Sequence, residues 1–207
     1  MSVEAIKIIR GIDGAIVDAQ LHSGLRAVDL TLIERQWSPW RQDIVRRLSE
    51  RGVDPSIWPQ SLHWDWFAKL RYLQLLAVEV CAIDAEGEWQ AIVMMETVTR
   101  RCQLPAQAGK HLVYVDYVET APWNWPIPEL GLSRRFKGLG HILFRYVIRR
   151  SFELGYKGRI GLVALPQAEA FYGTTLGMAQ IPATSPHDLD YFELSEAKAM
   201  ELIIQEN

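Results

Sequence analysis

A basic, glycine-rich turn is the segment of this sequence whose residue types most clearly suggest chemistry. Glycine at two of its positions lets the main chain approach a ligand closely. A helix is predicted to follow the turn and to end near Gly155. The first amides of a helix point outward, without partners, at the positive end of the helix dipole. Such a turn can hold an anion such as pyrophosphate, although glycines before a helix are also ordinary turn residues. The residues of the turn are Arg135, Phe136, Lys137, Gly138, Leu139, Gly140 and His141.

The two commonest nucleotide-binding motifs are absent from the turn. A P-loop requires a final glycine followed by Lys and then Ser or Thr, and neither Gly138 nor Gly140 is followed by that pair. A dinucleotide-binding fold requires a third glycine at position 143, which is leucine, and a parallel sheet. The sequence therefore excludes both classes.

Strands with short connections precede the turn. Residues 75–83 and 89–99 are apolar and rich in β-branched side chains, and the polar turn between them predicts an antiparallel hairpin. A third strand is predicted over 111–120. No room remains for crossover helices, which indicates the antiparallel centre of an α+β fold. Residues 122–128 contain three prolines and predict a stiff loop.

The N-terminal part predicts a strand followed by helices. Residues 5–10 read as the strand, and residues 15–36 show helical spacing, interrupted as in a broken helix. Ser38 as N-cap and Pro39 at the first helical position predict a second helix that ends at Gly52. The other predicted elements are a helix over 61–73, a strand over 159–165, a short helix over 166–176 closed by Gly177, a strand over 191–194 and a helix from the cap Ser195 to about Ile204.

Two motifs, the glycine-rich turn and the segment over residues 168–178 that follows it, resemble motifs of the GNAT acyltransferase superfamily. The turn matches the family pattern Gln/Arg-x-x-Gly-x-Gly/Ala through Arg135, Gly138 and Gly140. Residues 168–178 resemble the family's Ala-x-x-Phe-Tyr-x-x-x-Gly-Phe segment, with Met178 in place of the final Phe. The resemblance implies an α+β fold with a mixed, mostly antiparallel central sheet flanked by helices on both faces.

The resemblance covers roughly residues 75–195, and we expect one GNAT-like domain over 1–207. Within it, residues 1–74 would supply an N-terminal strand and helices on the acceptor side. Residues 75–195 would form the acyl-CoA-binding core, and residues 196–207 a C-terminal helix.

The same resemblance implies where acetyl-CoA, or another acyl-CoA, binds as co-substrate. Backbone amides from Phe136 to His141 would hold the pyrophosphate, and the pantetheine arm would lie beside the strand end at Thr120 and Ala121. The phenol of Tyr172 would lie near the thioester sulfur, where it could protonate the departing thiolate. The alternative for Tyr172 is a packing role against the sheet.

Transfer to an amine also needs a proton acceptor, because an ammonium has no lone pair for attack. Glu119, near the end of the long central strand, is the first choice for the base, acting directly or through an ordered water. Asp116 lies an odd number of residues away and should face the opposite side of the strand. Either carboxylate could instead be solvated or an ion-pair partner.

Two aromatic-rich stretches are candidates for the acceptor site. The first contains His63, Trp64 and Asp65, and the second contains Trp123 and Asn124. These tryptophans could simply fill core volume. Alternatively, the loop between strand and turn, longer than is usual in the family, walls an acceptor pocket in which His63 and Asp65 orient the amine.

We therefore expect an N-acyltransferase that moves an acetyl or other short acyl group from acyl-CoA to an amine by direct attack in a ternary complex. A non-catalytic acyl-CoA-binding sensor or partner-binding module is the alternative. The inserted loop, the unassigned base and Met178 keep it open. A small-molecule or peptide amine is the expected acceptor, with a protein N-terminus, a lysine or a charged tRNA also open.

Composition narrows the remaining classes. The 207 residues are 49% hydrophobic and 23% charged, as in globular domains, and the net charge of −3 makes nucleic acid an improbable partner. Cys81 and Cys102, without a CxxC motif or clustered histidines, indicate neither a metal site nor a ping-pong nucleophile. The absence of a signal peptide or long apolar run predicts a cytoplasmic protein that binds no membrane. The C-terminal helix could support a homodimer.

Overall fold

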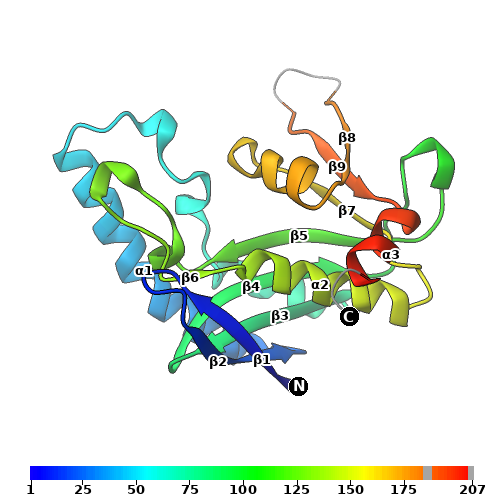
Figure 1. Ribbon diagram of the computed structural model, residues 1–207, viewed down its shortest axis with the longest axis horizontal. Coiled ribbons are helices and arrows are strands. Elements are labelled where there is room, and N and C mark those ends of the chain that lie inside the picture. The colour runs from blue at the N-terminus through cyan, green and yellow to red at the C-terminus, as the bar shows by residue number, and fades with distance from the viewer. Residues whose placement is uncertain (184–187, 205–207) are drawn as a thin grey trace. The chain divides into compact units, whose positions relative to one another are not determined.

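The computed structural model describes residues 1–183 and 188–204 (Figure 1). Within them, nine strands form one mixed sheet in the order β6-β1-β2-β3-β4-β5-β7-β9-β8. The β5–β7 pair is parallel, whereas the pairs β1–β2, β1–β6, β2–β3, β7–β9 and β8–β9 are antiparallel. The predicted α+β class with a mostly antiparallel sheet is confirmed. The elements are β1 (Ser2–Arg10), β2 (Ile16–Ser23), α1 (Ala27–Glu50), β3 (Val78–Ala85), β4 (Glu88–Glu96), β5 (Val113–Thr120), β6 (Phe136–Lys137), α2 (Leu139–Glu153), β7 (Ile160–Val163), β8 (Ala179–Ile181), β9 (Tyr191–Leu194) and α3 (Glu196–Ile204).

The chain divides into two compact units. Residues 1–93 and 118–143 form the first, and residues 94–117 and 144–207 form the second. These boundaries fall inside β4, β5 and α2, not after residues 74 and 195. The expectation of one domain with those internal parts stays a prediction.

In the first unit, β1 and β2 form a long antiparallel hairpin with Ser2 opposite Ser23 and Ile9 opposite Ile16. The helix predicted over 15–36 is therefore wrong in its first half. Along β2 the buried Ala19 and Leu21 alternate with exposed polar residues, which is the period of a strand. This alternation indicates a strand, but the apolar residues over 15–36 also fit helical spacing, which led to the wrong prediction.

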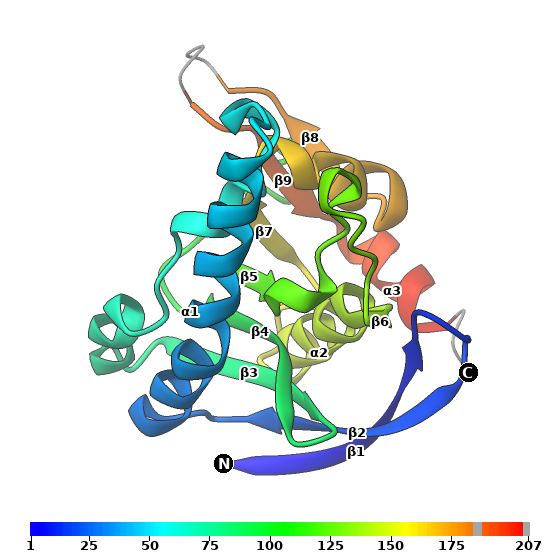
Figure 2. The same ribbon diagram turned by 90° about the vertical axis from the view of Figure 1, so that its left-hand side faces the viewer.

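Helix α1 is unbroken from Ala27 to Glu50, with Pro39 inside it (Figure 2). The prediction that Ser38 caps a new helix is wrong, whereas the stop at Gly52, with φ +64°, is confirmed. The buried residues of this helix keep the same helical spacing on both sides of the proline. Burying them stabilises the helix by more than the loss of one backbone hydrogen bond at the proline destabilises it. The stripe that they form consists of Leu30, Ile33, Trp37, Arg41, Ile44 and Leu48.

The helix predicted over residues 61–73 is also wrong. This segment contains two 3₁₀ turns, Gln60–His63 and Ala68–Gln74. Between them the Asp65 carboxylate accepts hydrogen bonds from the amides of Phe67 and Ala68, at 2.7 and 3.1 Å. A side chain that binds the backbone in this way ends one turn and starts another.

The remaining predicted elements are confirmed with shifted ends, apart from one, and the short strands β6 and β8 are additional. The short helix predicted over 166–176 consists of a 3₁₀ turn, Pro166–Ala168, and a π turn, Phe171–Thr175. The Ser195 cap is confirmed, because its hydroxyl accepts a hydrogen bond from the Lys198 amide at 3.2 Å. Among the described residues, no helix combines the length and apolar character needed to cross a bilayer.

The continuous α1 helix leads to a first prediction. Replacing Pro39 with alanine should raise the free energy of unfolding by about 1–3 kcal/mol, because it restores a hydrogen bond inside the helix. Urea denaturation measures the change, with exposed Arg35→Ala as a control that should alter stability little. If Pro39 instead opened a helix, where proline is favourable, the substitution would be neutral or destabilising.

Candidate functional site

The glycine-rich turn opens at the start of α2. The first intrahelical bond runs from the Ile142 amide to the Gly138 carbonyl at 3.2 Å, so the amides of Leu139 and Gly140 precede the helical ladder. Gly138 is exposed with φ +79°, and a Cβ built on it would meet no described atom within 4 Å. The main chain can therefore be approached closely here, at the positive end of the helix dipole.

The residues before Gly138 are fixed to the N-terminal hairpin. Phe136 and Lys137 form β6 and pair antiparallel with Arg10 and Ile9 of β1. The Gly11 amide extends this ladder by donating to the Arg135 carbonyl at 2.7 Å. The first strand of the chain thus sets the position of the turn.

Two of the amides predicted to bind the cofactor have partners within the protein. The Phe136 amide donates to Asn124 Oδ1 at 2.8 Å, and the buried Ala121 amide donates to the Gln90 carbonyl at 2.8 Å. Neither can bind a ligand without losing that bond. Thr120 is half-buried at the end of β5. That these three residues bind the cofactor stays a prediction.

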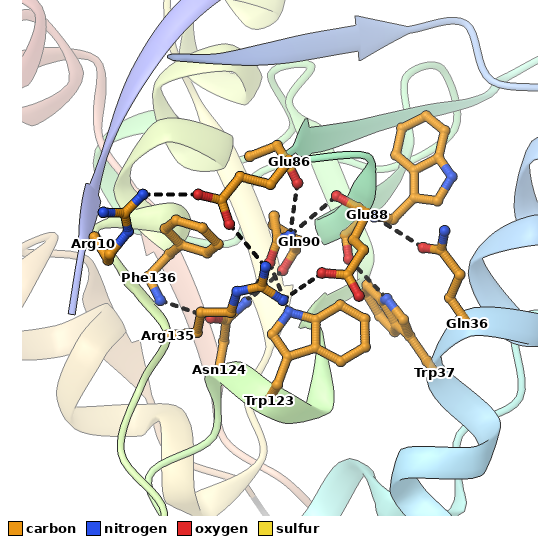
Figure 3. A network of polar contacts seen from close by, with 12 residues as sticks. Arg10, Gln36, Trp37, Glu86, Glu88, Gln90, Trp123, Asn124, Arg135 and Phe136 are labelled. Carbon is orange, nitrogen blue, oxygen red and sulfur yellow. Dashed lines mark hydrogen bonds and ion pairs between the residues drawn. The ribbon is translucent and has the colours of Figure 1, made fainter. Parts of the chain in front are cut away.

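The Arg135 side chain is directed to acidic residues of the β3–β4 hairpin (Figure 3). Its guanidinium donates to Glu86 at 2.8 Å and also to Glu88, and Arg10 donates to the other oxygen of Glu86 at 2.9 Å. These bonds hold the pKa of Glu86 below its usual value. Arg135 therefore braces the turn, and exposed Lys137 is the basic side chain of the turn nearest the helix start.

Glu119, the predicted base, lies in a buried polar cluster. Its Oε2 accepts hydrogen bonds from Trp66 Nε1 at 2.6 Å and from Arg41 Nη2 at 3.1 Å. The side chain is only 1% exposed, and burial raises its pKa to about 7 against the opposing effects of Arg41 and Trp66. Glu119 Oε1 is buried with no hydrogen-bond partner among the described residues. Asp116, by contrast, is exposed.

Arg41 joins this cluster to a second carboxylate. Its Nη1 contacts the two oxygens of Glu34 at 2.8 and 3.0 Å, and Glu34 Oε2 also accepts a bond from the Trp66 amide at 2.8 Å. Sequence reasoning missed both residues. They are seven positions apart and share a helix face, but a helix broken at Ser38 conceals this relation.

A cavity of about 440 Å³ lies against this cluster. Its lining includes Glu34 and Arg41 of α1 together with Trp64 and Asp65 of the 60–66 segment. The structure therefore brings these two predicted acceptor residues to one cavity, next to the guanidinium that holds Glu119. The third, His63, is exposed and contacts the Trp64 ring edge-on at 6.5 Å.

Trp123 and Asn124 have a different environment from the one predicted. Both are buried, and their polar atoms bind Gln90, with Trp123 Nε1 donating to Gln90 Oε1 at 2.7 Å (Figure 3). The Trp123 ring packs edge-on against Trp40 at 5.6 Å. These polar groups have partners within the protein, and the prediction that the two residues bind an acceptor stays a prediction.

In the second unit, Tyr172 is buried in an aromatic cluster. Its ring lies 5.5 Å from Phe144 and 5.9 Å from Phe192. Burial raises the pKa of the phenol, so it stays protonated at neutral pH and retains a proton to donate. The packing role is thus observed, and the proton-donor role stays a prediction.

Cysteine chemistry finds little support in the described part of the chain. Cys81 and Cys102 are both buried and free, and burial raises the pKa of Cys102 to about 11. A thiol with that pKa is a poor nucleophile at neutral pH. Among the described residues, no group of His, Cys, Asp or Glu is arranged to hold a metal ion.

Comparison with known proteins identifies the fold. No protein-family model matches the sequence, and no curated protein matches it either. A GNAT-family acetyltransferase from Listeria monocytogenes superposes with a TM-score of 0.50 and 14% identity, covering 91% of this chain and 99% of that one. The chain has the GNAT fold. An uncharacterized protein from Bacillus halodurans shares this architecture with a TM-score of 0.55 and 10% identity, covering 98% of both chains. The predicted GNAT-like fold is confirmed.

The buried cluster leads to a second prediction. Replacing Arg41 with methionine keeps much of its volume but leaves the buried Glu119 and the half-buried Glu34 without their cation. The free energy of unfolding should fall by about 3–5 kcal/mol. Chemical denaturation measures the loss, and adding Glu119→Gln should make the double variant lose less than the sum of the single losses. Simple additivity would show that the two side chains are not energetically coupled.

Proposed function

We propose that this protein is an N-acyltransferase that moves an acetyl or other short acyl group from acyl-CoA to an amine. The observation that carries the proposal is the open main chain at Gly138, at the start of α2, on a GNAT fold. In this proposal the amides of Leu139, Gly140 and His141 bind the pyrophosphate, and Lys137 adds positive charge. The site suits such a ligand, because the amides of Leu139 and Gly140 precede the helical ladder and Gly138 leaves room beside the backbone.

The proposed reaction is a direct transfer. The amine nitrogen attacks the thioester carbonyl carbon, a C–N bond forms, and the C–S bond breaks as the tetrahedral intermediate collapses. Before attack, the acceptor ammonium gives a proton to Glu119, which frees the nitrogen lone pair. As the intermediate collapses, the CoA thiolate takes a proton from the Tyr172 phenol, and the phenolate regains one, through solvent, from the positively charged nitrogen of the new amide; Glu119 then releases its proton to solvent. Because Glu119 is almost fully buried, the proton would reach its unpartnered Oε1 through an ordered water.

The proposed acceptor is a small-molecule or peptide amine that enters the cavity beside Trp64. Its volume of about 440 Å³ lies in the range of small-ligand sites. Asp65 lies on its wall, and a carboxylate attracts a cationic amine.

The anion-binding part of the proposal can be tested with two matched glycine variants. Gly138 and Gly109 are both exposed, have φ of +79° and +75°, and have open space around a built Cβ. Gly138→Val should raise the dissociation constant of CoA at least about tenfold, since a side chain intrudes where the phosphates approach. Gly109→Val carries the same backbone strain and should leave it unchanged. Calorimetric titration measures both, and equal affinities would remove the assignment.

The same proteins test turnover. Release of CoA thiol from acetyl-CoA should occur in the presence of a panel of amines and should be lost in Gly138→Val at low acetyl-CoA concentration. Tight CoA binding without thiol release across the panel would contradict the enzyme and favour a non-catalytic acyl-CoA-binding module.

The role of Glu119 predicts a pH dependence. A general base works only when deprotonated, so kcat/KM should fall as pH decreases below about 7, the pKa that burial gives Glu119. Glu119→Gln should abolish this acid limb and lower the rate at pH 8 by about 10²–10⁴-fold. Profiles measured with one acceptor keep any contribution from the amine itself constant. An unchanged acid limb in Glu119→Gln, with its loss in Asp116→Asn, would move the base to Asp116.

A further inference from the structure

The ligand-binding turn is attached at its root to the loop that follows β5. The Phe136 amide donates to Asn124 Oδ1 at 2.8 Å, and the Arg135 amide donates to the Trp123 carbonyl at 3.3 Å. Phe136 and Asn124 are both buried. The loop inserted between β5 and the turn therefore contacts the turn through one side-chain acceptor and one main-chain acceptor, just before the residues proposed to bind the pyrophosphate.

Asn124 is in turn held by Gln90 of β4. Asn124 Nδ2 donates to the main-chain carbonyl and to Oε1 of Gln90, both at 3.2 Å. Trp123 Nε1 donates to the same Oε1 at 2.7 Å. One buried glutamine thus fixes the two residues that hold the turn (Figure 3).

The Gln90 side chain is itself oriented by its neighbours. Its Nε2 donates to the carbonyls of Ala85 and Glu88, both at 3.1 Å. Turning the amide over would place its oxygen against two carbonyls and its nitrogen against two donors. Gln90 is 0% exposed, so either mismatch would leave buried polar groups unpaired. The network therefore has a single favourable arrangement.

The buried network outweighs the ion pairs around it. Arg10 and Arg135 reach Glu86 and Glu88 with side chains that are 35–38% exposed. Exposed pairs of this kind each contribute about 0–1 kcal/mol. The buried amide side chains of Gln90 and Asn124 therefore contribute more to holding the turn than these ion pairs do, alongside the pairing of β6 with β1.

We propose that Gln90 and Asn124 are positioning residues that hold the turn at residues 135–141 in its ligand-binding conformation. They touch no ligand. They fix the root of the turn, while the chain from Gly138 onward stays open to solvent, and a turn fixed in advance loses less conformational freedom on binding. The effect on affinity rests on the proposed CoA-binding function, whereas the bracing of the turn does not.

Asn124→Ala tests the inference, because it removes both halves of the link. In the free protein, NMR hydrogen exchange of the Phe136 amide should become at least about tenfold faster, since its acceptor is gone. The dissociation constant of CoA should rise at least about tenfold. Leu30→Ala, at a buried position of α1 outside both the network and the β1–β2 hairpin, is the control for general loss of stability and should change both values by less than about threefold.

Trp123→Phe provides a second, milder variant in case Asn124→Ala does not fold. It keeps an aromatic ring and removes only the hydrogen bond to Gln90 Oε1. The hydrogen-exchange rate of the Phe136 amide and the dissociation constant of CoA should therefore each rise by about threefold. Unchanged exchange at Phe136 would overturn the bracing, and faster exchange with unchanged CoA affinity would overturn its role in binding. If the wild-type protein binds no CoA, the proposed function is overturned, and the exchange data alone still decide whether Asn124 holds the turn.

Discussion

A guanidinium buried between two carboxylates is the interaction on which the candidate site depends. Arg41 projects from the apolar stripe of α1 and contacts Glu34 and Glu119. Ions taken out of water are tolerated only when they are paired, so these side chains constrain one another's positions. Trp66 binds both carboxylates, through its amide and its indole N–H, and is fixed by the same charges. The helix, the end of β5 and the wall of the cavity are thereby joined in one arrangement.

That arrangement explains why Glu119 is fully buried and yet can carry a charge near neutral pH. Full burial disfavours the charged form, whereas Arg41 and Trp66 favour it, and the resulting pKa of about 7 lies near neutrality. A carboxyl group at this balance can take up and release a proton at little cost. A solvated glutamate would be fully ionised at neutral pH and a weaker base. The buried cluster thus links the stability of the first unit to the chemistry proposed for it.

The sequence sufficed to predict the fold class and the turn, because both depend on local signals. Glycine spacing, the Ser195 cap and the β3–β4 turn act over a few residues. The missed features depend on tertiary packing. Pro39 reads locally as a helix start, yet the buried stripe from Leu30 to Leu48 continues through it. Because the sequence predicts a new helix at Ser38, Glu34 and Arg41 are assigned to different helices, and their contact could not be predicted. Likewise, nothing near residues 123–124 shows that their polar groups bind Gln90.

The short pairing between β6 and β1 has a consequence for how the protein is handled. Because Ile9 and Arg10 are registered against the turn, any change that frays the first strand is transmitted to residues 136 and 137. A bulky fusion partner or a deletion at the amino end would act on a distant loop without altering a single residue within it. Position 11 allows no substitution by a residue with a side chain, since a Cβ there would lie 1.8 Å from the Arg134 carbonyl oxygen.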